Sequence, residues 1–241
     1  MVKTGADIYE FLAPTYQSIC ESRARYIAAV NQHCIELLSQ SRNWLDVGSG
    51  DGARVRDIIS QVRIENIVCI EPSRAMADLC AENVPEGEVY NRYLDVLFSN
   101  NHLNHFDCVT ALWNVLGHVP SAGERRGFVD HVRTALRPGG IFLLDVNNRH
   151  NGQAYGFFRC LSRYLLDRFC FRESNGDATY TLTVNGKSER CQGHIFTAEE
   201  LVDLFPRDKW ASVEICYIHY RSGKRVNTRF QGQILVKAIA L

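Results

Sequence analysis

The sequence predicts an α/β fold built on a doubly wound, mostly parallel, seven-stranded sheet. Between residues 43 and 146, short apolar runs alternate with segments of helical periodicity, which is the pattern of strands joined by crossover helices. A turn with glycines at positions 48, 50 and 52 directly follows the first apolar run. Two extended runs come last, near 211–220 and 229–240, and turn at Ser222-Gly223. In such sheets ligands bind at the carboxyl ends of the strands.

The first forty residues are expected to form helices that cover the sheet. Pro14 divides residues 5–40 into a short helix and a longer one, because proline disrupts a helix interior. The longer segment repeats apolar side chains at helical spacing: Ile19, Tyr26, Ile27, Val30, Cys34, Leu37 and Leu38. We therefore expect an N-terminal helical cover over residues 1–41.

Five strands follow the cover. They are expected at 43–48, 67–70, 87–94, 106–112 and 141–146. Ser73 is a suitable N-cap for a helix through Ala81, and Arg-Pro-Gly-Gly at 137–140 should stop a helix over 121–136. Residues at or just past the strand ends should line one crevice: Gly48, Glu71, Asp95, Trp113 and Asn147.

Residues 147–196 break the alternation and are expected to form an inserted lid. Their first part is rich in aromatic side chains, and Asn185-Gly186 between two extended runs predicts a β-hairpin. Thr197 and Glu200 show the pattern of a capping box for a helix through Leu204. We expect one domain over 1–241, in which the lid closes over the strand ends and also offers a surface for a homodimer.

Composition narrows the classes of partner. Apolar residues make up 46% of the 241, and 27 basic residues balance 27 acidic ones. Without a basic excess, no nucleic-acid partner is expected. No apolar stretch has membrane-spanning length, and the first residues lack the apolar core of a signal peptide. Nine cysteines without a C-x-x-C pair suit reduced thiols, so we expect a cytoplasmic protein without a membrane partner.

The glycine turn over residues 48–53 fits three interpretations. As G-x-G-x-x-A it could hold a dinucleotide pyrophosphate at a helix N-terminus, and it could also be an ordinary tight turn. As D-x-G-x-G-x-G it includes Asp46, and Asp51 lies within it. These carboxylates would repel a pyrophosphate and suit a positively charged ligand. Glu71, at the tip of the next strand, can accept hydrogen bonds from two ribose hydroxyls, so an adenosine-containing cofactor is favoured.

The D-x-G-x-G-x-G pattern resembles the first motif of the class I S-adenosylmethionine-dependent methyltransferases. Residues 107–119, 136–145 and 193–201 are similar to later motifs of that family. The segment Ile8-Tyr-Glu-Phe-Leu-Ala-Pro-Thr-Tyr16 is similar to the Y-x-x-x-A-x-x-Y-D segment of small-molecule methyltransferases, although Gln17 replaces the aspartate. The resemblance implies a Rossmann-like methyltransferase fold. It also implies S-adenosyl-L-methionine as the cofactor, S-adenosyl-L-homocysteine as its product, and a small-molecule methyl acceptor.

The same resemblance assigns cofactor-binding roles. Asp46 would hold the methionine end, Glu71 the ribose and Asp95 the adenine amino group. Tyr16 and Arg25, with Arg23 as the alternative, would reach the carboxylate. Met76 would pack on the adenine or belong to the core. The full expected set is Tyr16, Arg25, Asp46, Gly48, Ser49, Gly50, Gly52, Glu71, Pro72, Ser73, Met76, Leu94, Asp95, Leu112 and Trp113.

Candidates for the acceptor side lie past the fourth and fifth strands and in the lid. The expected catalytic residues are His118, Asn148 and Arg149, and the expected substrate-binding residues are Asn114, Asn147, Tyr155 and His194. His118 could act as a base or stabilise a loop, and Arg149 could pair with a substrate carboxylate or lie on the surface. No metal site is expected, because His102-x-x-His105 lies in a polar loop and a structural zinc site needs four ligands.

Methyl transfer from a sulfonium is an in-line displacement to an acceptor N or O atom. Two alternatives to a small-molecule enzyme stay open at this point. One is a methyltransferase that acts on a macromolecule such as protein or tRNA. The other is a non-catalytic module that binds the cofactor.

Overall fold

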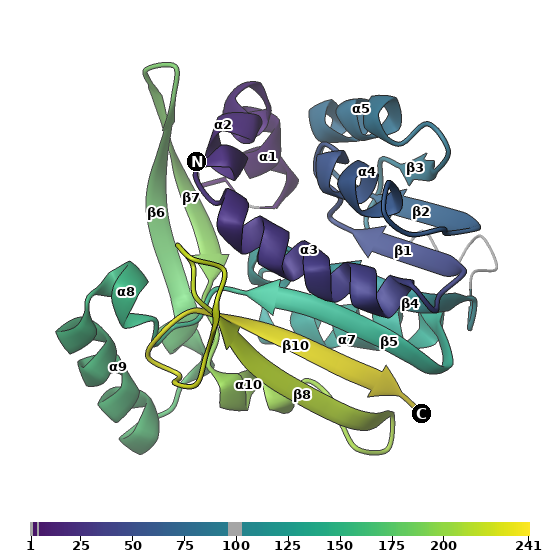
Figure 1. Ribbon diagram of the computed structural model, residues 1–241. Helices are drawn as coiled ribbons and strands as arrows, with labels where there is room; N and C mark the ends of the chain where they lie inside the picture. The colour runs from purple at the N-terminus through teal and green to yellow at the C-terminus, as the bar shows by residue number, and fades with distance from the viewer. Residues whose placement is uncertain (1, 4, 96–102) are drawn as a thin grey trace.

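A twisted eight-stranded sheet forms the centre of the computed structural model, which describes residues 2–3, 5–95 and 103–241 (Figure 1). Its strand order is β3-β2-β1-β4-β5-β10-β8-β9. The bounds are β1 (Asn43–Val47), β2 (Asn66–Ile70), β3 (Glu88–Tyr90), β4 (Phe106–Ala111), β5 (Leu136–Val146), β8 (Trp210–Ile218), β9 (Arg225–Val226) and β10 (Gln233–Ala240). Seven strands correspond to those predicted, and the two-residue β9 adds an edge. The doubly wound α/β fold is confirmed.

The parallel part of the sheet reverses its order at β1. β1 pairs in parallel with β2 on one side and with β4 on the other, so a crevice opens at the carboxyl ends of β1 and β4. β10 runs antiparallel between β5 and β8. The crossover helices are α4 (Ala53–Ile59), α5 (Arg74–Asn83) and α7 (Ala122–Ala135). β5 begins earlier than predicted, because Leu136 already pairs with Phe106 before a register shift.

Both faces of the sheet are buried. Neighbouring residues of β1 alternate between two cores, with Trp44 packed under the N-terminal helices and Leu45 on the side of α7. In Figure 1, α3 (Ala24–Leu38) crosses the front of the sheet and α7 lies behind it. Burial on both faces explains why these strands read as continuous apolar runs.

The N-terminal cover is helical and breaks at Pro14 as predicted, but the longer predicted helix divides again just before Ala24. It consists of α1 (Ala6–Leu12), the 3-10 turn η1 (Ala13–Thr15), α2 (Tyr16–Glu21) and α3. Glu10 anchors α1 to the start of α5, since its carboxylate accepts from Ser73 Oγ at 2.7 Å. Gln17 Nε2 donates to Asp51, which ties α2 to the glycine turn. The cover is thereby held over the strand ends.

The segment between β5 and β8 contains two helices, over residues 152–155 and 157–169, that were not predicted from the sequence. Its elements are α8 (Gly152–Tyr155), α9 (Phe157–Phe169), the 3-10 turn η3 (Glu173–Gly176), β6 (Asp177–Val184), β7 (Lys187–His194) and α10 (Ala198–Val202). The predicted hairpin is confirmed, and its turn has positive φ at Asn185 (50°) and Gly186 (76°). The capping box of Thr197 and Glu200 is also confirmed. Figure 1 shows the hairpin standing beside α1 and α2, with α8 and α9 at the other end.

The remaining predictions concern thiols, membrane spans and the histidine pair. All nine cysteines are free, and six of them are buried. None of the helices in the described part of the chain is both long and apolar enough to cross a membrane. His102, one half of the histidine pair, lies outside the described residues.

Candidate functional site

A mostly apolar cavity of about 540 Å³ opens at the carboxyl ends of β1, β2 and β4. The N-terminal cover contributes Tyr9 and Tyr16 to its wall. Eight of the residues expected to bind a cofactor line it: Tyr16, Gly48, Glu71, Pro72, Leu94, Asp95, Leu112 and Trp113. The expected catalytic residue His118 lines it too. Residues from five separate stretches of sequence therefore meet at the predicted crevice.

The glycine turn owes its three glycines to different constraints. All three have positive φ: 72° at Gly48, 58° at Gly50 and 75° at Gly52. A Cβ on Gly48 would lie 2.5 Å from Val115 Cγ2, and one on Gly50 would lie 3.1 Å from the Tyr16 hydroxyl. Gly52 instead packs against α5, where an added Cβ would meet Cys80 Sγ at 2.9 Å. Close packing against α5 is thus a reason for glycine at position 52, and its expected approach to the cofactor stays a prediction.

Glu71 stabilises the glycine turn and can still accept hydrogen bonds from a ligand. Its buried carboxylate accepts from the backbone N–H of Gly50 at 2.9 Å and of Ser73 at 2.8 Å. Burial raises the pKa of Glu71 to about 7. A carboxylate has about four lone-pair positions, so two remain for further donors. The two hydroxyls of a ribose fit that capacity.

A small second cavity lies beside the turn, lined in part by Tyr16, Asp46, Ser49, Arg54 and Trp113. Asp46 is buried and accepts from the Thr110 hydroxyl, and burial raises its pKa. Arg54 donates from Nε to Asn31 at 3.0 Å. Its buried Nη2 has no hydrogen-bond partner among the residues that the structure describes. An unpaired buried guanidinium nitrogen beside a cavity fits an anionic ligand group such as a carboxylate.

Arg54, and not Arg25, lines the second cavity. Arg25 is exposed on α3 and lines neither cavity, and the alternative Arg23 stacks on Tyr220 with its guanidinium 4.2 Å from the ring centre. The expected roles of Arg25 and Arg23 are therefore corrected. Its position in the sequence was the available signal, since Arg54 is the first basic residue after the turn and lies in the first turn of α4.

Tyr9 and His118 form a pair on the cavity wall. The Tyr9 hydroxyl lies 3.1 Å from His118 Nε2, and the two rings meet edge to face at 5.2 Å. Burial lowers the pKa of His118 to about 4 and raises the pKa of Tyr9 well above its ordinary value, so both are neutral at pH 7. His118 Nδ1 is buried without a hydrogen-bond partner in the described part of the chain. Tyr9 was missed although it begins the Y-x-x-x-A-x-x-Y segment.

Trp113 reaches the cavity from a strained backbone. Trp113 and Asn114 both have positive φ, 65° and 61°, which is unusual for residues with side chains. Asp145 holds the bend, because its Oδ1 accepts from Trp113 N at 2.7 Å and its Oδ2 from the Tyr26 hydroxyl at 2.6 Å. Asn114 is buried and accepts from the backbone of Asn147 at 2.9 Å. Asn114 therefore supports the bend rather than lining the cavity, which corrects its expected substrate-binding role.

The residues after β5 also turn away from the cavity. Asn147 accepts from Gln233 Nε2 at 2.8 Å, and Asn148 donates to the carbonyls of Arg229 and Gly232. The fully buried Arg149 donates to Ile195 O and contacts two carboxylates. The expectation that Asn148 and Arg149 are catalytic is corrected, because both are buried and neighbouring elements take up their polar atoms, while the substrate role of the half-buried Asn147 stays a prediction.

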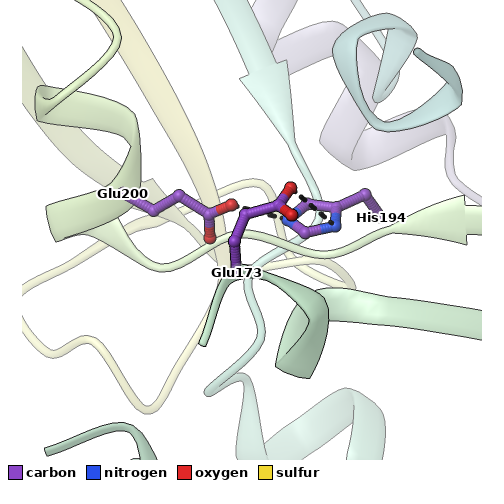
Figure 2. Close-up of side chains that lie close together, drawn as sticks. All are labelled: Glu173, His194 and Glu200. Carbon is purple, nitrogen blue, oxygen red and sulfur yellow. Dashed lines mark hydrogen bonds and ion pairs between the residues drawn. The ribbon is translucent and has the colours of Figure 1, made fainter. Parts of the chain in front are cut away.

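These carboxylates belong to a charged network under the lid. Arg149 Nη1 lies 3.2 Å from Asp167 Oδ1, and Arg149 Nη2 lies 2.8 Å from Glu200 Oε2. Figure 2 shows the carboxylates of Glu200 and Glu173 facing the imidazole of His194. His194 Nε2 is 2.6 Å from Glu200, and its Nδ1 is 2.8 Å from Asp177. His194 is thus buried in the network, which corrects its expected substrate-binding role.

Glu173, His194 and Glu200 also have the composition of a metal site. One ligand atom from each lies within 4.8 Å of the others. However, Arg149 contacts Glu200 and Arg125 contacts Glu173. The two guanidinium groups already supply the positive charge that a metal ion would bring. We therefore assign this cluster to an ion-pair network that ties α10, η3 and β7 together.

Three further expected residues lie away from the cavity. Met76 is fully buried in the core. Ser73 caps α5 and donates to Glu10, so its hydroxyl is engaged. Tyr155 lies under the guanidinium of Arg163, 5.5 Å from the ring centre. Burial of Met76 favours the alternative that it belongs to the core, and the ligand roles of Ser73 and Tyr155 stay predictions.

A family model described as "Methyltransferase domain" matches residues 45–142, which run from β1 into β5. The matched stretch contains the glycine turn, Glu71 and His118. No curated protein matches the sequence.

Solved structures resemble almost the whole chain. A Thermotoga maritima protein described as a possible histamine N-methyltransferase is 14% identical with a TM-score of 0.64, covering 97% of this chain and 99% of that one. A DhpI-SAM-HEP complex is 18% identical with a TM-score of 0.67, covering 96% and 94%. A methyltransferase in complex with the Haloferax volcanii Trm112 methyltransferase activator is 12% identical with a TM-score of 0.65, covering 100% and 99%.

The match of residues 45–142 to a methyltransferase domain supports the class predicted from the sequence, and the structural similarity shows a Rossmann-like fold over almost the whole chain. At 12–18% identity the structural similarity concerns the fold. The acceptor has to be inferred from this chain's own residues.

Proposed function

We propose that this methyltransferase acts on an N or O atom of a small organic molecule, with a neutral amine as the preferred acceptor. The observation that carries the proposal is the cavity itself. It is mostly apolar, measures about 540 Å³ and receives only a few polar groups, which is typical of small-molecule sites. Tyr9 and Tyr16 from the N-terminal cover form part of its wall, as expected of a site that excludes water.

The cofactor's position is inferred from polar atoms that can still donate or accept hydrogen bonds. Glu71 would accept the ribose hydroxyls, and Leu94 and Asp95 would frame the adenine. Arg54 would bind the carboxylate of the methionine part through its unpaired Nη2. When bound, S-adenosylmethionine supplies an electrophilic methyl group, and transfer requires the acceptor atom to lie in line behind it.

Tyr9 and His118 would orient the acceptor. With its pKa lowered to about 4, His118 is a neutral imidazole at pH 7 and a weak base. Its unpaired Nδ1 can hydrogen-bond the acceptor while Nε2 stays with Tyr9. A neutral amine already carries a free lone pair and needs no strong base, whereas an alcohol does. The pair therefore suits an amine better than an alcohol.

Calorimetry and a methyl-transfer screen test this proposal. We expect S-adenosylhomocysteine to bind, and one or more members of an amine, phenol and carboxylic acid panel to be methylated with S-adenosylmethionine. Tyr9→Phe and His118→Asn should lower kcat about 10²-fold while S-adenosylhomocysteine affinity stays unchanged, because they act on the acceptor's position. Methylation of tRNA or protein together with no methylation of the panel would contradict the proposal.

A further inference from the structure

Helix α9 presents an apolar face to solvent at the edge of the molecule. Phe158 is 84% exposed and Phe169 is 81% exposed, and Leu165 lies between them. Further large apolar side chains extend this face: Phe157, Leu166 and Phe171. Figure 1 shows α9 as an outer helix with no other element beyond it. A cluster of this kind marks an interaction surface, since scattered single side chains would need no explanation.

The spacing of these side chains places them along one side of the helix. Phe158, Leu165 and Phe169 are seven and four residues apart, which puts them on one side of an α-helix. The opposite side carries the buried Cys160 and Asp167, and Asp167 contacts Arg149 and His150 in the charged network. The polar side of α9 is therefore anchored inside the protein, and the apolar side is held outward.

Positive charge flanks this stripe. Arg159, Arg168 and Arg172 are exposed in or just after α9. Residues 156–172 contain four arginines and a single acid, Asp167, which is engaged inside the protein. The whole chain has no net charge, so this is a local excess. Charge complementarity therefore calls for an anionic partner.

We propose that α9 docks the protein on an anionic lipid bilayer. Phenylalanine and leucine side chains would enter the boundary between headgroups and acyl chains, and the arginines would contact the acidic headgroups. Docking on a surface needs no spanning helix. The inference goes beyond the proposed function, does not depend on it, and departs from the sequence-based expectation of no membrane partner.

A second copy of the chain fits this surface less well. In a two-fold interface the same patch meets itself, so the exposed arginines of the two copies would approach each other. The segment offers no exposed acid to offset them. Like charges at an interface suppress association. We therefore do not assign the homodimer expected from the sequence to this surface. Light scattering, which measures the oligomeric state, tests this point.

Vesicle sedimentation of the full chain tests the proposal. We expect binding to phosphatidylcholine vesicles that contain phosphatidylserine, weakening as salt is added, and little binding to phosphatidylcholine alone. The double variants Phe158→Ser/Phe169→Ser and Arg159→Glu/Arg168→Glu should each reduce the bound fraction about tenfold or more. Leu103→Ser is the matched control, because Leu103 is an exposed apolar residue elsewhere, and it should bind like the parent chain.

A tryptophan probe locates the contact. Phe158→Trp should show a blue-shifted emission on anionic vesicles, and Leu103→Trp should not. Thermal melting should be unchanged in all of these variants, because the substituted side chains are exposed. The proposal is overturned if the parent chain ignores anionic vesicles or if the α9 variants bind as well as it does. It is also overturned if light scattering shows a dimer that Phe158→Ser/Phe169→Ser abolishes.

Discussion

The cavity wall and the charged network under the lid are built from similar side chains and use them in opposite ways. At the cavity, Arg54 Nη2 and His118 Nδ1 are buried without hydrogen-bond partners among the described residues. In the network, Arg149 donates from three nitrogens, to Ile195 O, Asp167 and Glu200. Both regions follow strands of the same sheet. What differs is whether the protein's own groups take up the donors of the central arginine: those of Arg149 are paired, and within the described part of the chain Arg54 Nη2 is not.

That difference separates function from stability. A buried polar atom without a partner destabilises the free protein by about 1–3 kcal/mol, so its presence at a cavity indicates a ligand group. A fully paired buried cation holds its neighbours together and has no donor left for a substrate. Position at a strand end selected Arg149 and Asn148 from the sequence, whereas an unpaired buried nitrogen together with a place on a cavity wall selects Arg54 and His118.

The largest expected effect lies in the network. Arg149→Met should lower the free energy of unfolding by about 3–5 kcal/mol, because the buried Asp167 and Glu200 lose their shared partner. Urea unfolding followed by circular dichroism measures the loss.

Arg42→Met is the control for this substitution. Arg42 Nε lies 3.8 Å from Glu65, and both side chains are largely exposed. Removing that pair should change the free energy of unfolding by about 0.5 kcal/mol or less. If Arg149→Met is as stable as Arg42→Met, the network does not hold the lid and the comparison between the two regions fails.

The second largest expected effect is on cofactor binding, and it tests whether Arg54 contacts a ligand. Arg54→Gln should weaken S-adenosylhomocysteine binding about 10- to 100-fold, because a hydrogen bond to a charged group contributes roughly 1.5–3 kcal/mol. Calorimetry should show little change for 5′-methylthioadenosine, which lacks the amino-acid carboxylate. The two ligands together isolate the carboxylate contact from any general change in the cavity.

Arg56→Gln provides a matched control on the same helix. Arg56 bonds Asn83 through Nη1 on the exposed side of α4, so both ligands should bind as they do to the parent chain. An equal loss of both ligands in Arg54→Gln would show that Arg54 only shapes the cavity. The assignment of its Nη2 to a carboxylate would then be wrong.

Local patterns predicted the fold because they are set by neighbouring residues. Pro14, the Asn185-Gly186 turn and the Thr197 capping box each act within a few residues, and each is found where the sequence placed it. α9 was missed because its apolar residues face solvent and its anchored side includes Asp167. Apolar periodicity predicts a helix most clearly when the apolar side faces a core.

The candidate site also contains some residues that sequence patterns predict and others that they do not. Gly48, Glu71 and Trp113 were predicted because parallel strands end at one edge of the sheet. Asn148 follows a strand end too, but distant segments fold back and bind its side chain. Tyr9 and Arg54 reach the cavities only through the docking of the N-terminal cover and the packing of α4. Such contacts depend on tertiary structure that no local pattern contains.

The smallest expected effect is a pH dependence that Glu71 gives to the cavity. Burial raises the pKa of Glu71 to about 7, and the carboxylate form is the one that accepts two ribose hydroxyls. S-adenosylhomocysteine affinity should therefore fall as pH drops through 7, by at most about tenfold per pH unit. Burial lowers the pKa of His118 to about 4, so His118 stays neutral between pH 5.5 and 8 and does not contribute.

The stability of the free protein should change with the opposite sign. The folded pKa of Glu71 lies above its ordinary value of 4.5, so the folded state binds the proton more tightly than the unfolded state does. This contribution is fully present below about pH 4.5 and is lost as pH rises through 7. Glu71→Gln should flatten both profiles relative to the parent chain. If affinity keeps its pH dependence in Glu71→Gln, another group titrates in the cavity and Glu71 does not hold the ribose as its carboxylate.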